Sequence, residues 1–569
     1  MFKRILVAVM VLTLFASVLA GCSTSGKEQV LNVNWQQEPP DMDPQTTTDQ
    51  ISFWLLNATL EGLFRYQPDG SLGDGLAESY ELSDDKLTYT FHLRDANWSD
   101  GTPITAEDFA FAWKRALDPV TASEYSYMLY YLKNGEIINT LPSYQGIVEE
   151  GVGGENGYTQ EDVDAAQAYL DENGALTLDD VGIKALDEKT LEVTLEQPTP
   201  YFLGLTTFPT YLPAQKAAVD QFGEEYALEA DSMAFSGPYI ISEWVHEQSL
   251  TLTKNPEYWD SNAVKLDTIH GVMLTENNTI VQMYESGELD MINVPDEFYD
   301  SYKDSDEYGK LAQATTWYLM FNCEGKYFSN LKMREAFSMA VSKETFVESI
   351  VNNMGFVADG LVPPSLSGKG GKTFGETRAD AGVALPAFDP EGAKAKLDEA
   401  LAELDATMDD LEAEVTIIGG EGDTWSKYLQ YLQGQFEQNL GVHLGIEQMS
   451  FAQRLDRYDA KDYEISFAGW GGDYDDPMTF LDMWVTGNGN NDAYWSNATY
   501  DGSIRQAIAG EGDERIDAYV EAENQIATDL PICPVYHPVW DYMTKPYVKG
   551  VARYVTGSDY DFKWAEIEK

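Results

Sequence analysis

The pattern of apolar residues changes near residue 310, and this change constrains the fold more than any other feature of the 569-residue chain. Before it, segments with alternating apolar residues come in pairs around short turns, as in 77–93 and 181–195, which is typical of antiparallel strands. After it, strand patterns such as 315–322 and 414–420 alternate with helical patterns such as 425–440. This alternation predicts an α/β domain. At about 150 residues per domain, the length allows three or four domains.

Local signals predict several further elements. Thr105 followed by Asp108 reads like a capping box, so a helix is expected directly behind it. Helical spacing predicts one helix over 331–350 and another over 518–530. The acidic, glycine-containing stretch 150–180 is expected to lie on the surface, with one helix.

The first 22 residues have the form of a secretory signal. Lys3 and Arg4 precede an apolar run over 5–18, which is shorter than the roughly 20 residues of a membrane span. The run ends in Leu-Ala-Gly-Cys22, which resembles the bacterial lipobox, in which the cysteine thiol receives a diacylglyceryl group. We therefore predict a signal peptide at 1–21, lipidation of Cys22 and a tether at 22–29. The alternative is an ordinary signal peptide with an accidental cysteine.

Charge and motif content exclude several function classes. There are 96 acidic and 36 basic side chains, a formal charge of −60, which excludes nucleic acid as a partner and favours a soluble monomer. Neither an HExxH pair, a G-x-S-x-G elbow nor a phosphate-binding loop occurs, which weakens hydrolase and ATPase interpretations. Asp473, Asp475 and Asp476 lack the glycine and glutamate of an EF-hand loop, so neither a metal nor a cofactor is predicted. Cys323 and Cys533 are expected to be free thiols rather than a pair.

The order of long motifs resembles one family, the oligopeptide- and dipeptide-binding lipoproteins of bacterial ABC importers, which are family 5 extracellular solute-binding proteins. The matching stretches cover nearly all of residues 30–560 and include LRDANWSDGTPITAEDFAFAWKR (93–115), LTKNPEYWD (252–260), LKMREAFSMAVSKE (331–344) and GWGGDYDDPMTFL (469–481).

The resemblance implies an α/β, two-lobed, periplasmic-binding-protein-like fold of type II, in the large peptide-binding class, with an extra inserted domain. Lobe I would comprise 30–60, 184–315 and 540–569, the inserted domain 61–183, and lobe II 316–539. Ligand binding would close the lobes at a hinge.

The resemblance also implies the ligand site. Asp473 would pair with the α-ammonium of a peptide, because an amine that loses its water in a closed site needs an ionised partner. Gly471 and Gly472 would let the backbone approach the ligand. The other implied ligand-binding residues are Trp470, Tyr125, Phe451 and, through backbone pairing, Thr48, Asp49 and Gln50. Taken without the family, Asp473 could instead cap the turn that follows it, and the aromatic residues could be core.

Recognition of the ligand's C-terminus departs from the family pattern. Tyr458 and Phe467 stand where oligopeptide receptors carry basic residues. Arg454, Arg457 and His537 are the candidates that could replace them. An anchored peptide N-terminus is thus expected, whereas the length of the ligand stays open.

The expected function is capture of peptides outside the cytoplasm and their delivery to two membrane permeases driven by two cytoplasmic ATPases. The expected location is the lipid-anchored surface of a Gram-positive cell, in preference to a periplasm. The alternatives are a peptide-pheromone receptor that feeds no transporter, the same fold with a non-peptide ligand, and, less favoured, an extracellular hydrolase. We expect a binding protein and not an enzyme.

Overall fold

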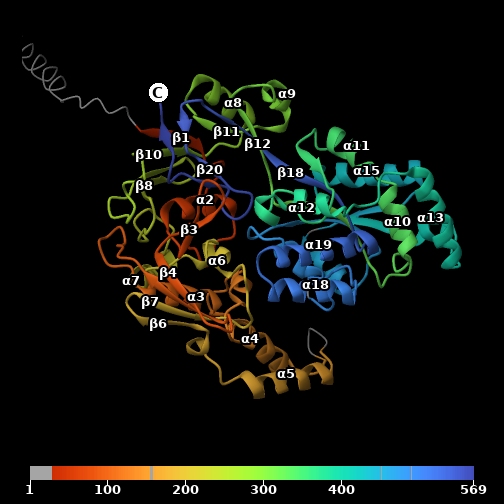
Figure 1. Cartoon of the computed structure of the whole chain (residues 1–569), viewed down its shortest axis with the longest axis horizontal. Helices are drawn as coiled ribbons and strands as arrows, with labels where there is room; N and C mark the ends of the chain where they lie inside the picture. Colours follow the sequence, from red (N-terminus) through yellow and green to blue (C-terminus); the bar gives the residue numbers. More distant parts are fainter. Residues whose placement is uncertain (1–28, 154–157, 450, 489) are drawn as a thin grey trace, which may run out of the picture.

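The computed structural model describes residues 29–153, 158–449, 451–488 and 490–569. The predicted signal peptide and Cys22 lie outside these residues. Figure 1 shows two parts side by side along the long axis, with strand β18 running between them. We call residues 30–312 together with 539–569 the strand-pair part, and residues 315–536 the α/β part. In the described ranges no helix has both the length and the apolar character needed to cross a bilayer.

A four-stranded sheet forms one layer of the strand-pair part. Its order is β1 (Val30–Asn34), β10 (Thr268–Val272), β9 (Ser249–Lys254) and β8 (Tyr239–Val245). β1 runs parallel to β10, and the other pairs are antiparallel. Alternate residues of β1 are buried, as its sequence pattern requires. Helix α2 (Gln50–Thr59) packs beside this sheet and is buried along most of its length.

A second four-stranded sheet has the order β4 (Ala77–Leu82), β5 (Thr88–Leu93), β7 (Thr190–Thr194) and β6 (Ile183–Asp187). All its pairs are antiparallel, as the alternating patterns predict. The sheet lies across the boundary predicted at residue 183, because β6 begins there and β7 pairs directly with β5.

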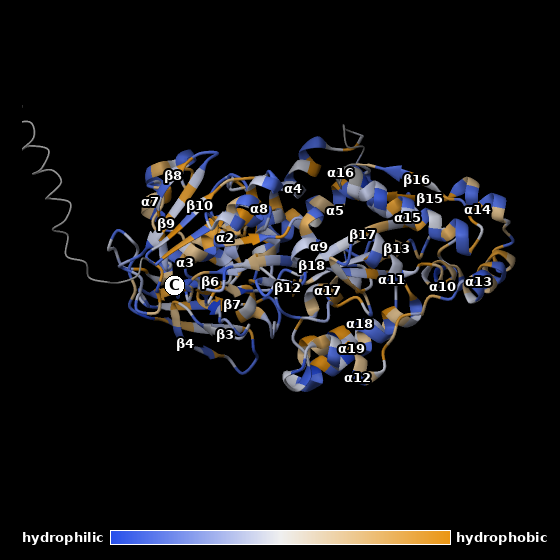
Figure 2. Ribbon diagram, turned by 90° about the horizontal axis from the view of Figure 1, so that it is seen from above, coloured by the Kyte–Doolittle hydropathy of each residue, from blue (hydrophilic) through white to orange (hydrophobic). Residues whose placement is uncertain are grey.

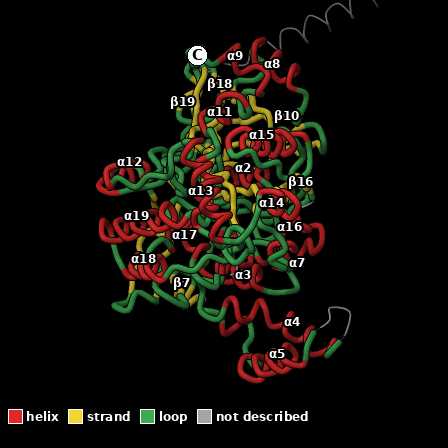
Figure 3. The backbone as a smooth tube through the Cα atoms, turned by 90° about the vertical axis from the view of Figure 1, so that its right-hand side faces the viewer, coloured by secondary structure: helices red, strands yellow, loops and turns green. Residues whose placement is uncertain are grey.

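Helix α3 (Ala106–Leu117) covers the second sheet. The capping box of Thr105 and Asp108 is present, so the predicted helix start is confirmed. Helices α4 (Gly135–Glu150) and α5 (Gln160–Asn173) form a hairpin that projects from the body (Figures 1 and 3). Their stacked rings, Tyr144 and Tyr169, lie 4.0 Å apart.

The largest sheet belongs to both parts. Its order is β11-β18-β13-β17-β15-β16, and β12 and β14 also pair with β18. The bounds are β11 (Met291–Asn293), β12 (Tyr308–Ala312), β13 (Thr315–Phe321), β14 (Gly355–Val357), β15 (Thr416–Gly419), β16 (Gly445–Gln448), β17 (Ile465–Gly471) and β18 (Ile532–Thr544). Strands β15 and β16 are parallel and β13 is antiparallel to both its neighbours, so the sheet is mixed.

The 13-residue strand β18 connects the two parts. Its first half pairs with β13 in the α/β part, and its second half, from Val539 to Thr544, pairs with β12 and β11 in the strand-pair part. Within the first half the register shifts once, because Trp317 pairs with Tyr536 and Tyr318 pairs with Pro534. A single strand therefore passes across the boundary predicted at 539 and 540.

The helices of the α/β part lie around its strands. Figure 2 shows hydrophobic and hydrophilic residues in turn along α18 and α19, which is typical of helices with one buried face. The predicted helix 331–350 is instead two helices, α10 (Leu331–Met339) and α11 (Lys343–Ser349). The break occurs because Ser342 caps α11 by accepting a hydrogen bond from the Thr345 N–H. The predicted helix 518–530 begins earlier, as α19 (Gly512–Asp529).

The other helices of this part are α12 (Phe374–Ala381), α13 (Pro390–Glu403), α14 (Met408–Glu414), α15 (Asp423–Asn439), α16 (Phe451–Asp459), α17 (Met478–Leu481) and α18 (Ala498–Ala509). The short elements of the strand-pair part are β2 (Phe64–Tyr66), β3 (Leu72–Asp74), α6 (Phe202–Leu205), α7 (Lys216–Phe222), α8 (Asn277–Ser286), α9 (Tyr299–Tyr302), β19 (Val548–Lys549), β20 (Ala552–Arg553), β21 (Tyr560–Asp561) and β22 (Glu566–Ile567). Cys323 and Cys533 are free thiols, the second fully buried.

A buried ion cluster ties the C-terminal segment to the N-terminal helix. Arg65 is 4% exposed, and its guanidinium contacts Glu61 at 2.9 Å and Asp561 at 2.5 Å. Glu61 also accepts a hydrogen bond from the Tyr258 hydroxyl. The cluster joins positions almost 500 residues apart in the sequence.

We predict that Arg65→Ala lowers the free energy of unfolding by about 3–5 kcal/mol, because it leaves two buried carboxylates without their cation. The measurement is the midpoint of urea unfolding followed by tryptophan fluorescence. Arg505→Ala is the control, since Arg505 is exposed on α18 and its loss should change the midpoint little. Equal midpoints for the two variants would contradict the prediction.

Candidate functional site

A cavity of about 670 Å³ lies where the two parts meet. The strand-pair part contributes most of its lining and the α/β part contributes Thr315 and the end of β17. The lining residues are Gln36, Gln37, Gln50, Ile51, Phe53, Trp54, Tyr125, Phe208, Asn293, Gln313, Ala314, Thr315, Gly471, Gly472, Asp473, Trp540, Val555, Thr556, Gly557 and Asp559. None of these is a lysine, arginine or histidine, and the volume is in the range of small-molecule sites.

Asp473 lies two residues after the end of strand β17 and lines this cavity. Its backbone N–H donates to Thr479 Oγ1 at 3.1 Å, but its carboxylate has neither a hydrogen bond nor an ion pair with any described residue. Burial alone raises the pKa of Asp473 to about 6. The side chain makes no capping hydrogen bond to the turn that follows, and a role in ligand binding stays a prediction.

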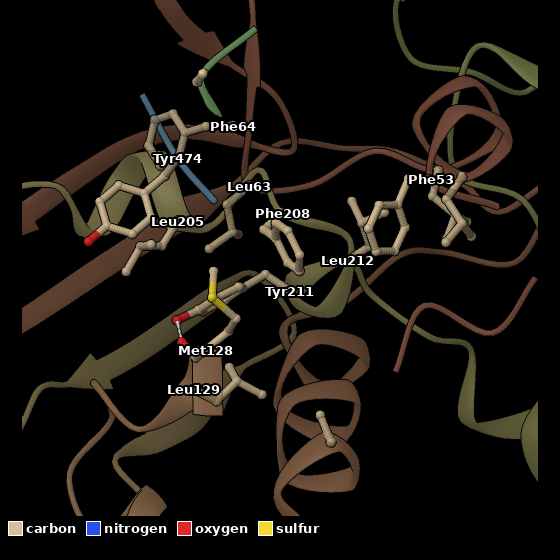
Figure 4. Packing of buried hydrophobic residues seen from close by; sticks show 14 of the residues in the cluster. Phe53, Leu63, Phe64, Met128, Leu129, Leu205, Phe208, Tyr211, Leu212 and Tyr474 are labelled. Atoms are coloured by element: carbon tan, nitrogen blue, oxygen red, sulfur yellow. Dashed lines mark hydrogen bonds between the residues drawn. The ribbon is translucent and has the colours of Figure 1, made fainter. Parts of the chain in front are cut away.

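The next residue, Tyr474, holds the loop in place. Its ring stacks on Tyr201 of the strand-pair part, with centroids 4.9 Å apart and planes 7° from parallel. Figure 4 shows Tyr474 beside Leu63, Phe64 and Leu205, within the core of that part. This packing joins the two parts at the position that carries Asp473.

The neighbouring aspartates are engaged elsewhere. Asp475 accepts hydrogen bonds from the N–H and hydroxyl of Ser367. Asp476 lies 2.7 Å from Arg515 and accepts a hydrogen bond from the Tyr519 hydroxyl. Because the three carboxylates have different surroundings, they do not converge on one point as metal ligands would.

The negative charge of Asp473 raises the pKa values of other acidic and phenolic groups nearby. Burial and then the charge of Asp473 raise the pKa of Asp482 to about 7. The same two causes raise the pKa values of Tyr125 and Tyr127. Tyr125 itself lines the cavity and packs against Phe53 and Phe208. The region near Asp473 thus combines aromatic walls with negative charge, a combination that favours a cation.

The two glycines before Asp473 have different roles. A Cβ at Gly472 would lie 2.8 Å from the ring of Phe480, so this glycine is required by packing beneath the loop. A Cβ at Gly471 would meet only the Thr315 hydroxyl, at 3.5 Å. Packing therefore accounts for the glycine at 472 but not for the one at 471. Close approach of a ligand to the backbone stays a prediction for both, and Gly471 is the better candidate.

Trp470 is not among the residues that line the cavity. Its indole N–H donates to the Thr479 carbonyl at 2.7 Å, and its ring packs against the core. Through this hydrogen bond Trp470 stabilises the loop that carries Asp473. Direct contact between Trp470 and a ligand stays a prediction.

Of the three residues predicted around the start of α2, one lines the cavity. Gln50 lines it, and its amide donates to the Gly557 carbonyl at 3.0 Å. Asp49 is the N-cap of α2, accepting from the N–H groups of Ile51 and Ser52, and Thr48 is exposed. Phe451 begins α16, and its side chain lies outside the described residues.

The residues considered for the ligand's C-terminus are engaged away from the cavity. The Arg454 guanidinium lies over the Trp425 ring. Arg457 forms ion pairs with Glu447 and Asp462. The buried His537 shares a hydrogen bond with the Thr316 hydroxyl. Tyr458 and Phe467 are buried. None of the five lines the cavity around Asp473.

Asp559 is a site residue that the sequence reasoning missed. It is 6% exposed, lines the cavity and accepts a hydrogen bond from the Trp54 indole at 2.8 Å. Burial raises its pKa to about 8, so it is mostly uncharged at neutral pH. No sequence motif surrounds Asp559, which lies in a loop near the C-terminus. Only the tertiary structure places it beside Trp54 of α2.

Comparison with known proteins identifies the family. The family model "Bacterial extracellular solute-binding proteins, family 5 Middle" matches residues 72–492. The chain belongs to this family. The resemblance drawn from the motifs is therefore confirmed, and so is the two-lobed fold class.

Three similar proteins cover nearly the whole chain. The dipeptide-binding protein DppE of Bacillus subtilis is 33% identical, over 95% of this chain and 92% of its own. The oligopeptide-binding protein OppA of the same organism is 30% identical, over 97% of each chain. The solved structure of Listeria monocytogenes OppA bound to peptide is 30% identical with a TM-score of 0.71, and the match covers 96% of this chain and all of that one. The family 5 protein thus matches these relatives over at least 92% of their length.

We predict that Asp473→Asn stabilises the ligand-free protein. The folded pKa of about 6 exceeds the ordinary 3.8, so ionisation opposes folding once the pH rises above 3.8, and this penalty is complete above pH 6. The free energy of unfolding should rise by on the order of 2 kcal/mol at pH 7.5, and by less at pH 5. Urea unfolding at both pH values is the measurement.

Asp492→Asn is the matched control, because burial also raises the pKa of Asp492 to about 6 and this residue does not line the cavity. It should stabilise with the same pH trend. Destabilisation by Asp473→Asn at pH 7.5 would show that its carboxylate has a compensating partner in the empty protein.

Proposed function

We propose that this protein is the lipid-anchored, peptide-capturing receptor of an ABC importer. The names of its relatives, a dipeptide-binding and an oligopeptide-binding protein, support peptides as the ligand class. The solved OppA relative is bound to peptide, and its match covers 96% of this chain. On this proposal the protein binds and releases its ligand without chemical change.

The observation that carries the proposal is the carboxylate of Asp473, which has no partner among the residues that the structure describes. A peptide α-ammonium would supply the missing partner, and pairing would return the buried carboxylate to its ionised form. The lining of the cavity carries no basic side chain that could compete for Asp473. Pairing a cation from the ligand thus removes a penalty that the empty protein has to bear.

Closure of the two parts on the ligand would use the connections between them. These are the residues between β12 and β13 and the middle of β18, where the pairing partner changes. We propose the same division of the chain into lobe I, the inserted domain and lobe II. The inserted domain would end after Thr194 and not at 183, because β6 and β7 belong to the same sheet as β4 and β5. Ligand would stabilise the closed form through its contacts with both sides of the cavity.

The location and partners follow from the N-terminal sequence and the family. A diacylglyceryl group on Cys22, with one or two further acyl chains, would hold the protein at the outer face of the cell membrane, beside its permeases. The permeases and two cytoplasmic ATPases would complete the importer. The strong negative charge supports a soluble monomeric receptor. We propose that it works on the surface of a Gram-positive cell, the kind of cell from which its Bacillus subtilis relatives come.

We predict that Asp473→Asn weakens peptide binding about 100-fold or more, since it leaves the ligand ammonium buried without a counter-charge. Peptides released from the purified wild-type protein are first identified by native mass spectrometry, and the affinity of one of them is then measured by calorimetry at pH 7.5. Asp492→Asn should bind as the wild type does.

The two measurements on Asp473→Asn should have opposite signs, with higher stability and lower affinity. Unchanged affinity would overturn the assignment of Asp473. A single co-purified peptide would favour a dedicated signalling receptor, a non-peptide cargo would overturn the ligand class, and cleaved peptide would point to a hydrolase.

We predict that Cys22→Ala leaves the protein without an acyl group, because the cysteine thiol is the acceptor in a lipobox. Intact-protein mass spectrometry would show no lipid mass, and the protein would leave the membrane fraction. Cys323→Ala is the control and should stay acylated and membrane-bound. An acylated Cys22→Ala protein would contradict the lipobox interpretation.

A further inference from the structure

The short helix α17 packs against the loop that carries Asp473. Its second residue, Thr479, is 3% exposed. The Thr479 hydroxyl accepts a hydrogen bond from the Asp473 backbone N–H at 3.1 Å, and the Thr479 carbonyl accepts one from the Trp470 indole at 2.7 Å. One buried threonine therefore holds the loop at two positions, three residues apart.

The methyl group of Thr479 lies close to the same loop. A Cβ placed on Gly472 would be 3.1 Å from this methyl carbon and 2.8 Å from the Phe480 ring. Because threonine is branched at Cβ, its methyl and hydroxyl groups are fixed relative to each other, and a single rotamer serves both contacts. Thr479 thus fits the loop in shape as well as in hydrogen bonding.

Helix α17 is itself held by the long helix α19. Asp476 caps α17 by accepting a hydrogen bond from the Met478 N–H at 2.9 Å. The same carboxylate lies 2.7 Å from Arg515 and accepts a hydrogen bond from the Tyr519 hydroxyl, and both of these residues belong to α19. The position of Thr479 is therefore set by the framework of the α/β part.

The connection between the two parts supplies a second hold on the loop. The Gly472 N–H donates to the Ala314 carbonyl at 2.7 Å, and the Ala314 N–H donates to the Val555 carbonyl at 3.0 Å. Ala314 lies between β12 and β13, where the chain passes from the strand-pair part to the α/β part. The backbone at Asp473 is thus fixed through its own N–H by Thr479, and one residue earlier by this connection.

None of these hydrogen bonds uses the Asp473 carboxylate, which has no partner among the described residues. The contacts fix the backbone that carries the carboxylate and leave its oxygens free for a ligand. The attraction between two charges falls as they separate, and the loss is greater in a buried site, where little water screens them. A carboxylate that serves as a buried counter-charge therefore has to be held to within about 0.5 Å.

We propose that Thr479 is a positioning residue for the ligand: its hydroxyl fixes the Asp473 backbone and so sets how closely the carboxylate meets the ligand ammonium. Thr479 does not line the cavity, so it acts through Asp473 and not by touching the ligand. This inference rests on the proposed function and adds a residue to its site.

The test compares a peptide that is released from the purified wild type with the N-acetylated form of the same peptide, which has no ammonium group. Both are measured by calorimetry at pH 7.5, in displacement format for the weaker ligand, with the wild type, Thr479→Val and Thr479→Ser. Valine has the shape of threonine without its hydroxyl, whereas serine keeps the hydroxyl.

Thr377→Val is the matched control. Thr377 belongs to the same part and is also buried, and its hydroxyl also accepts a hydrogen bond from a loop N–H, that of Lys369, at 3.0 Å. It does not line the cavity around Asp473. Thermal melting establishes whether each variant is folded.

Thr479→Val should bind the free peptide roughly tenfold more weakly than the wild type, because the Asp473 N–H loses its acceptor and the carboxylate is displaced. Its affinity for the acetylated peptide should equal that of the wild type, since this peptide has no charge for Asp473 to meet. Thr479→Ser should restore tight binding of the free peptide, and Thr377→Val should bind both peptides as the wild type does.

An equal loss of affinity for both peptides in Thr479→Val would show a merely structural role and overturn the proposal, as would undiminished binding of the free peptide. If Thr479→Val does not fold, Thr479→Ala replaces it, with the same expected results. A wild type that binds the two peptides equally would instead overturn the pairing of the ammonium with Asp473, and with it the proposed function of this site.

Discussion

The carboxylate of Asp473 is buried without a hydrogen-bond or ion-pair partner among the described residues, and the surrounding structure supplies the free energy that this requires. The Tyr474 ring stacks on Tyr201, the Trp470 indole donates to the Thr479 carbonyl, and the Asp473 N–H donates to the Thr479 hydroxyl. These contacts fix the loop on both sides of the carboxylate while leaving its oxygens unbonded. The raised pKa of Asp473 is the physical sign of that arrangement, since only desolvation produces it.

The path of the chain explains why such a site can exist between two parts of one protein. Strand β18 pairs with strands of both parts, and the Arg65 cluster ties the last segment back to the first helix. The cavity walls are thereby built from segments that are hundreds of residues apart, including Gln50, Asn293 and Gly557. On the proposed function, closure of the two parts would change the shape of a site assembled in this way.

Patterns in the sequence predicted what local interactions decide. The strand pairs at 77–93 and 181–195 follow from alternation, and the start of α3 follows from Thr105 and Asp108. The break between α10 and α11 was missed, because helical spacing continues through a residue whose hydroxyl caps the next helix. Asp473, Gln50 and Tyr125 do meet at one cavity, but Trp470 faces the core and Asp559 was not foreseen. Those placements depend on tertiary packing, for which a single sequence carries no periodic signal.

On the proposed function, pairing with Asp473 would set overall affinity without discriminating among peptides, because every peptide with a free N-terminus carries the same ammonium. The near-neutral Asp559 fits this proposal, because a second ionised carboxylate in the same cavity would favour cationic side chains.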